Sequence, residues 1–229
     1  MYHHIAGDIP FGTVCCYTSP QDFRAQMESL RSWGYTAITP TYLLEVLFEG
    51  GVLPPRPVVI TFDDGWVDVY ENAYPIMKEM GFVGAVYLVG NYKNAKGCLS
   101  VDQLKELAGA GWELGSHSMS HPNDLRYSQD LQWEVQQSQI VIEEAVGVEV
   151  TTFAYPYGWY DGKVATMVSQ YYFGALALGG QYTHRWSTIY ALNRIEVKVG
   201  IDLDAFASLL PWWGPLEEPT PTPTSTVIP

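Results

Sequence analysis

The sequence predicts an α/β fold with a mainly parallel sheet, either open or closed into a barrel. Apolar, strand-like segments alternate with amphipathic, helix-like segments over residues 1–210, which is typical of such folds. Residues 58–62, VVITF, are nearly all apolar, as expected for a strand covered by helices on both faces. With 229 residues and 47% hydrophobic content, the chain is long enough for one large domain with a sizeable core.

Boundary residues place each element along the chain. Ser19-Pro20 is a good helix start because proline suits the first turn, and Thr41 and Ser100 are expected to cap two further helices. Glycines such as Gly34 end the helices that precede them. The expected strands are 1–5, 35–39, 58–62, 82–89, 112–116, 150–155, 172–178 and 192–199. The expected helices are 20–33, 41–48, 67–80, 101–108, 128–146, 163–170 and 203–210.

The composition argues against two classes of partner. A net charge of −13 disfavours nucleic acid, because phosphate contacts need a basic surface, and it disfavours anionic membrane surfaces for the same reason. No apolar run approaches the ~18 residues that a membrane helix needs. The 8 Trp and 16 Tyr suit stacking on sugar rings, although a large aromatic core would have the same composition. No signal peptide is visible, and a strand at residue 1 leads us to expect that an upstream segment has been removed.

The three cysteines do not indicate a disulfide framework. Cys15 and Cys16 are adjacent, and neighbouring cysteines rarely bond each other. Cys98 could form one bridge, but we expect small buried thiols instead.

The composition changes from Gly214 onward. Residues 217–229 read EEPTPTPTSTVIP, a Pro/Thr-rich linker that cannot bury a core. We therefore expect one domain over residues 1–212 and a linker tail over residues 213–229. Such linkers commonly join secreted domains to anchors or binding modules.

Two adjacent carboxylates, Asp63 and Asp64, end the most apolar strand and are followed by Gly65. Aspartate is a poor strand residue and is costly to bury unpaired. A helix N-cap would explain one of the two, but not both. In parallel α/β folds the C-terminal end of a strand is where catalytic residues lie, so these carboxylates are candidates for chemistry.

Two histidines, His117 and His121, follow another predicted strand in the sequence SHSMSH. On one helical turn or a tight loop, this spacing lets both imidazoles face the same way. Alone, such a pair is more often two histidines in a polar surface loop. Together with one of the aspartates, the pair forms a three-ligand metal site with open coordination positions.

These motifs resemble those of the polysaccharide deacetylase family, carbohydrate esterase family 4. TFDDG resembles the first family motif, SHSMSH the H-[ST]-x-x-H motif and FAYPYG the third, over a region of about 1–210. The opening YHHI, with FAYPYG, is most similar to the secreted poly-N-acetylglucosamine deacetylase branch, whose general-acid motif is permuted to the N-terminus. The resemblance implies a distorted (β/α)7 barrel with mainly parallel strands.

The resemblance also implies the ligands and the base. Asp64, His117 and His121 would bind a divalent metal, with zinc expected, and Asp63 would be the general base. Such a metal acidifies a water nucleophile and polarises the acetyl carbonyl. A carboxylate within hydrogen-bond reach then takes the proton of the water.

The remaining roles fall to the N-terminus and the third motif. His3, which follows Tyr2 as in the permuted motif, would be the general acid that protonates the leaving amine; otherwise it is a histidine at a frayed terminus. His4 should point to the opposite face of a strand, so only one of the two can serve. Tyr157 would donate its backbone N–H to the oxyanion.

The sequence departs from the family pattern at the residue that orients the base. The third motif usually carries an arginine, which is missing here, and Arg194 is our candidate replacement. The alternative is a surface arginine paired with Glu196. The fourth motif is not recognisable, although Trp159 and Asp161 either line the site or shape a turn, and His184 is a weaker candidate for the acid.

We therefore expect a secreted or cell-surface, metal-dependent N-deacetylase that acts as a monomer on a polysaccharide containing N-acetylglucosamine, such as a cell-wall or biofilm glycan. A deacetylase for peptidoglycan or chitooligosaccharides is the first alternative. A catalytically impaired carbohydrate-binding relative is the second, because the motif arginine is missing. A 2-His-1-carboxylate iron oxygenase is the third, because its ligand set is the same.

Overall fold

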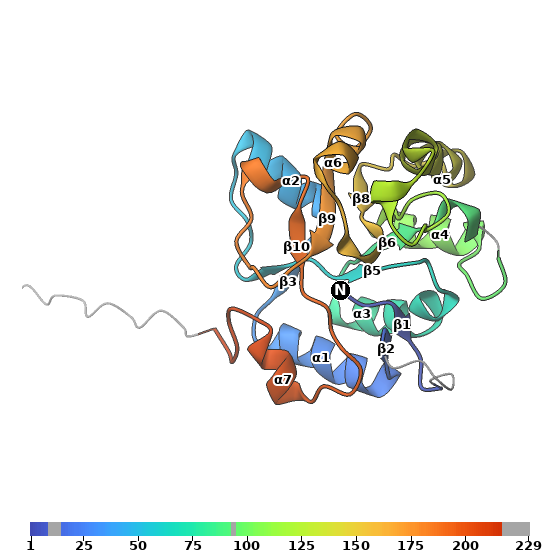
Figure 1. The fold of residues 1–229 in the computed structure, drawn as a ribbon. Helices are drawn as coiled ribbons and strands as arrows, with labels where there is room; N and C mark the ends of the chain where they lie inside the picture. The colour runs from blue at the N-terminus through green and yellow to red at the C-terminus, as the bar shows by residue number, and fades with distance from the viewer. Residues whose placement is uncertain (9–14, 93–94, 217–229) are drawn as a thin grey trace, which may run out of the picture.

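The computed structural model describes residues 1–8, 15–92 and 95–216, and its centre is a curled six-stranded sheet (Figure 1). The strand order is β10-β9-β8-β7-β6-β5, and every neighbouring pair is parallel. These strands are β5 (Thr61–Phe62), β6 (Ala85–Leu88), β7 (Glu113–Ser116), β8 (Thr152–Ala154), β9 (Gly174–Leu178) and β10 (Leu192–Arg194). The predicted α/β class with a mainly parallel sheet is confirmed.

The N-terminal segment closes the curl of this sheet. Tyr2 forms a parallel bridge to Phe62 of β5, while Met1 accepts a hydrogen bond from the Val197 amide (3.0 Å) and its nitrogen donates to the Ile195 carbonyl (2.8 Å). Residues 1–2 therefore lie between the two edge strands, and Figure 1 shows the N-terminus beside β5. This arrangement agrees with the expected distorted (β/α)7 barrel.

Two small parallel sheets flank the barrel, formed by β1 (His4–Ile5) with β2 (Tyr17–Thr18) and by β3 (Thr36–Ala37) with β4 (Pro57–Val58). The prediction of one strand over 58–62 is wrong, because the first half of this segment pairs with β3 and the second half pairs with β6. The Val58 carbonyl accepts from the Ile38 amide, whereas the Ile60 carbonyl accepts from the Ala85 amide. The first half therefore belongs to β4 and the second half to β5.

Helices cover the outside of the barrel (Figure 1). They are α1 (Pro20–Ser32), α2 (Pro40–Glu49), α3 (Tyr74–Met80), α4 (Val101–Gly109), α5 (Ser138–Val146), α6 (Gly162–Val168) and α7 (Leu203–Ser208). Shorter helical segments are η1 (Val69–Ala73), η2 (Gly90–Tyr92), η3 (Leu125–Tyr127), η4 (Trp133–Gln137), η5 (Pro156–Gly158) and η6 (Trp186–Thr188). As predicted, Ser19 caps α1 and Ser100 caps α4, the latter in a capping box with Gln103.

Two predicted helix starts are wrong. Thr39, not Thr41, caps α2, because Pro40 occupies the first turn and the Thr39 hydroxyl accepts from the Tyr42 amide. The long helix predicted from Ser128 begins after Asp130, whose carboxylate accepts from the Trp133 amide at 3.0 Å.

The cysteines differ from their prediction. All three thiols are free, Cys15 is exposed, and Cys16 and Cys98 are half-buried, so the expectation of small buried thiols is wrong. Within the described residues, every helix is too short or too polar to cross a membrane.

The predicted linker tail falls mostly outside the described part of the chain. Residues 217–229 lie beyond it. Residues just before them contact the domain, since Tyr35 donates to the Trp212 carbonyl (2.6 Å) and Arg56 donates to the Gly214 carbonyl (2.5 Å). The division at residues 212 and 213 stays a prediction.

Candidate active site

The predicted site residues follow the C-terminal ends of four parallel strands. Asp63 and Asp64 come after β5, His117 after β7, Tyr157 after β8, and Arg194 ends β10. Because parallel strands end at the same rim, residues far apart in sequence lie together there. Neither aspartate caps a helix, since the next helical segment begins at residue 67.

The backbone at this rim is strained. Six described residues other than glycine have positive φ, and four of them lie here: Asp64 (73°), Ser118 (66°), His121 (53°) and Tyr157 (57°). Such conformations cost about 1–3 kcal/mol each and persist only where the surrounding structure imposes them. Their concentration at one rim supports a functional role for these loops.

Asp64, His117 and His121 form a group that could hold a metal ion. Asp64 Oδ1 lies 3.7 Å from His117 Nε2 and 3.6 Å from His121 Nε2. His117 Nδ1 lies 2.7 Å from the Ala154 carbonyl, which can only accept, so Nδ1 carries the proton and Nε2 keeps its lone pair. Burial lowers the pKa of His117, which also favours the neutral ligand form. One carboxylate and two imidazoles with an open side fit a divalent cation such as zinc.

Asp63 is buried and paired with Arg194. The guanidinium donates to both carboxylate oxygens, at 2.6 Å and 2.8 Å, from a side chain that is only 6% exposed. Burial raises the pKa of Asp63, but the charges of Arg194, His117 and His3 outweigh burial and hold this pKa well below its usual range. The alternative of a surface Arg194 paired with Glu196 is therefore wrong.

The two N-terminal histidines have different surroundings. His4 stacks between Tyr17 and Trp66, and its Nδ1 contacts the Asp68 carboxylate at 2.6 Å. A nitrogen of the His3 ring instead lies within 4.8 Å of the Cys16 thiol and of a Glu196 carboxylate oxygen, and the charge of His3 acts on Asp63. The assignment of His3 as the general acid stays a prediction.

Aromatic rings border the metal-ligand group on one side. The Tyr157 ring contacts His121, with centroids 4.9 Å apart, and Trp159, 5.4 Å apart. Tyr157 and Trp159 are about half exposed, at 46% and 49%. Asp161 caps α6 by accepting from the Val164 amide, so it shapes the turn after the site.

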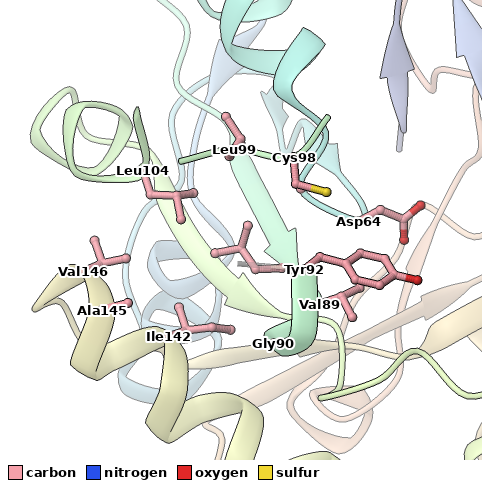
Figure 2. Close-up of a pocket in the computed structure, with 12 residues that line it drawn as sticks. Asp64, Val89, Gly90, Tyr92, Cys98, Leu99, Leu104, Ile142, Ala145 and Val146 are labelled. Carbon is pink, nitrogen blue, oxygen red and sulfur yellow. The ribbon is translucent and has the colours of Figure 1, made fainter. Parts of the chain in front are cut away.

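Two cavities lie next to this rim. One of about 20 Å³, drawn in Figure 2, has Asp64 at its edge and is otherwise mostly apolar, with room for about one water. A second, of about 650 Å³, is lined by Arg194, Thr61 and His184 among others. His184 lines this second cavity, and burial lowers its pKa.

Sequence reasoning missed three supporting residues. Trp66 donates from Nε1 to Asp64 Oδ2 at 3.1 Å, Glu134 accepts from the Met119 and Ser120 amides in the histidine loop, and Asp68 holds His4. Trp66 could have been suspected from its position two residues after Asp64. Glu134 carried no signal, because it reaches the loop from a helix elsewhere in the chain.

Comparison with known proteins agrees with this geometry. The family model described as polysaccharide deacetylase matches residues 50–175. YxkH of Bacillus subtilis (strain 168), assigned to the polysaccharide deacetylases, is 30% identical over 194 residues, covering 83% of this chain and 69% of that protein. The poly-beta-1,6-N-acetyl-D-glucosamine N-deacetylase of Staphylococcus epidermidis is 24% identical over 214 residues, covering 86% of this chain and 72% of that protein. The crystal structure of a Bacillus anthracis protein described as a polysaccharide deacetylase superposes with a TM-score of 0.82 and 27% identity, covering 91% of this chain and 67% of that one.

The matched region contains the two aspartates, both histidines of the candidate metal-ligand group and the FAYPYG motif. It covers more than half of the chain, and the structural match extends the likeness to the whole barrel. This chain therefore belongs to the polysaccharide deacetylase family, carbohydrate esterase family 4, whose members are hydrolases of carbohydrate metabolism.

Proposed function

We propose that this protein is a divalent-metal-dependent enzyme that removes N-acetyl groups from N-acetylglucosamine units of an extracellular or cell-wall polysaccharide. The observation that carries the proposal is the convergence of Asp64, His117 and His121 beside the Asp63–Arg194 pair. The relative from Staphylococcus epidermidis is named for that substrate, which supports this choice of glycan. Half-exposed aromatic rings at the rim suit contact with sugar faces.

Each residue has a role that its surroundings support. A cation held by Asp64, His117 and His121, zinc by the preference of this donor set, would supply the Lewis acidity that amide hydrolysis needs. Asp63 takes the proton of the attacking water, and Arg194 holds this carboxylate ionised and oriented.

Two other groups act on the leaving amine and on the oxyanion. His3 gives a proton to the departing sugar amine, so that acetate and the free amine separate. The Tyr157 backbone N–H donates to the oxyanion, and losing one such donor typically costs about 3–4 kcal/mol of transition-state stabilisation. We place the enzyme outside the cell or at its surface, as a monomer whose catalytic domain spans residues 1–212 and is followed by a linker.

The test is acetate release combined with metal analysis. Poly-β-1,6-N-acetylglucosamine, peptidoglycan and chitooligosaccharides are each supplied, with and without a chelator. We expect acetate release from the first polymer, lost on chelation and restored by zinc. Faster release from peptidoglycan or chitooligosaccharides would replace the proposed substrate with one of those glycans.

Two neighbouring variants separate the roles of the carboxylates. Asp64→Ala should lose the metal and the activity, while Asp63→Asn should keep the metal and lose about 10²–10⁴-fold in turnover, as is typical of a missing acid–base group. Glycan binding without acetate release in the unmodified protein would instead indicate a binding relative. Turnover that depends on oxygen would indicate an iron oxygenase.

A further inference from the structure

A second group of potential metal ligands lies beside the catalytic residues. His3, Cys16 and Glu196 each present one ligand atom, and these atoms all lie within 4.8 Å of one another. All three residues are half-buried, so a cation from solution can reach them. Among the residues that the structure describes, neither the His3 ring nor the Glu196 carboxylate has a salt bridge within 4.0 Å.

Three chain segments bring this group together through backbone hydrogen bonds. The His4 amide donates to the Cys16 carbonyl at 2.9 Å, where β1 pairs with β2. The Val197 amide donates to the Met1 carbonyl at 3.0 Å, which places Glu196 beside the N-terminal segment. The group is thus built on the closure of the barrel and not on one flexible loop.

We propose that His3, Cys16 and Glu196 form a second, thiophilic cation site, distinct from the Asp64–His117–His121 group. An imidazole, a thiolate and a carboxylate are the donors that zinc accepts in tetrahedral sites. The thiolate distinguishes this site chemically, because the catalytic ligand group contains no sulfur. On binding, the Cys16 thiol loses its proton to solvent and the cation gains a sulfur ligand.

Occupancy of this site has a consequence that rests on the proposed function. A cation bound to the His3 ring occupies the lone pair of a ring nitrogen. That nitrogen then cannot hold the proton that the leaving amine needs. The second cation therefore inhibits hydrolysis, while the first is required for it. Activity should rise with the first equivalent of zinc and fall as a second equivalent binds.

Cobalt is a suitable probe, because a thiolate ligand gives Co²⁺ a near-ultraviolet charge-transfer band that nitrogen and oxygen ligands do not. The metal-free full chain is titrated with Co²⁺ while absorbance and bound metal are measured. We expect about two equivalents, with the thiolate band growing during the second. Cys16→Ser and Glu196→Gln should each bind about one equivalent, and Cys16→Ser should lack the band.

Matched variants control for other thiols. Cys98→Ser should keep both equivalents and the band, and a circular-dichroism melt verifies that each variant is folded. Binding of about one equivalent with no band in the unmodified chain overturns the site. A band that survives Cys16→Ser but is lost in Cys15→Ser also overturns it, because the neighbouring thiol would then be the ligand.

A zinc titration of acetate release separates this site from the proposed mechanism. We expect Cys16→Ser to lose the inhibitory phase and keep the activating phase. If the second equivalent binds with its thiolate band but does not inhibit, the second site stands and the role of His3 as general acid is wrong.

Discussion

Two adjacent carboxylates at the end of β5 have opposite surroundings. The Asp63 side chain is 3% exposed and accepts from Nη1 and Nη2 of Arg194. The Asp64 side chain is 19% exposed, its φ is positive, and Oδ1 lies 3.7 Å from His117 Nε2 and 3.6 Å from His121 Nε2. The first is therefore held ionised beside the site, whereas Oδ1 of the second faces the two histidines and could bind a cation. Asp64 has a left-handed backbone conformation, and the two consecutive carboxylates have different partners: Arg194 for Asp63, and the two histidines for Asp64.

Removing Arg194 should destabilise the whole domain. Arg194→Met leaves Asp63 buried without its partner, and breaking a buried ion pair typically costs about 3–5 kcal/mol. The free energy of unfolding, measured with urea, should fall by that order. The double variant Arg194→Met/Asp63→Asn should recover much of the loss, because no unpaired charge remains; an unchanged stability in the single variant would contradict this account.

The two N-terminal histidines should separate activity from stability. His3→Ala should lower turnover about 10²-fold or more and leave the melting temperature nearly unchanged, since no described contact of the fold depends on its ring. His4→Ala should do the reverse, because its ring stacks on Tyr17 and Trp66 and pairs with Asp68. Acetate-release rates and thermal melts of both variants test this, and a larger loss of turnover in His4→Ala would reassign the general acid.

At the scale of elements, the short N-terminal segment closes the barrel. Residues 1–2 join β5 to the chain after β10, so the backbone bonds that close the barrel also fix the position of the next residue, His3. The helix that supports the histidine loop is a second example. Glu134, in η4, accepts from two amides of that loop, which ties the residues just before His121 to this helix.

The start of that helix can be tested with a matched pair of variants. Asp130→Ala removes the acceptor for the Trp133 amide and should cost about 1 kcal/mol in the free energy of unfolding. Ser128→Ala should cost little, because Ser128 only ends η3. Urea midpoints measure both, and a greater loss in Ser128→Ala would restore the helix start that the sequence suggested.

At the scale of the whole molecule, Glu113 links three elements. Its carboxylate accepts from the Thr41 amide of α2 and from the Thr152 hydroxyl of β8, while the residue itself lies in β7. Burial raises the pKa of Glu113. The hydrogen bonds lower this pKa, but by less than burial raises it. The folded state therefore holds the proton more tightly than the unfolded state does.

The raised pKa of Glu113 makes the free energy of unfolding depend on pH. This group contributes stability at pH values below the ordinary glutamate pKa, and that contribution is lost as the pH rises through the raised folded value. Glu113→Gln should flatten the decline in the free energy of unfolding over this window. Urea unfolding at several pH values measures it, and an equally steep decline in the variant would assign the effect to another group.

Residue types and their local spacing were sufficient to predict the α/β class, most element positions and the proximity of Asp64 to His117 and His121. Alternation of apolar and amphipathic segments depends only on local burial. TFDDG and SHSMSH each span the C-terminal end of a strand, so the parallel direction of the strands places both motifs at one rim. The partnership of Asp63 with Arg194, 131 positions apart, was open in the sequence and was decided by the barrel. The same holds for the division of residues 58–62 between two sheets and for the group of His3, Cys16 and Glu196. These features depend on which strands become neighbours when the sheet curls and closes, and that is a property of the packed molecule which no local pattern encodes.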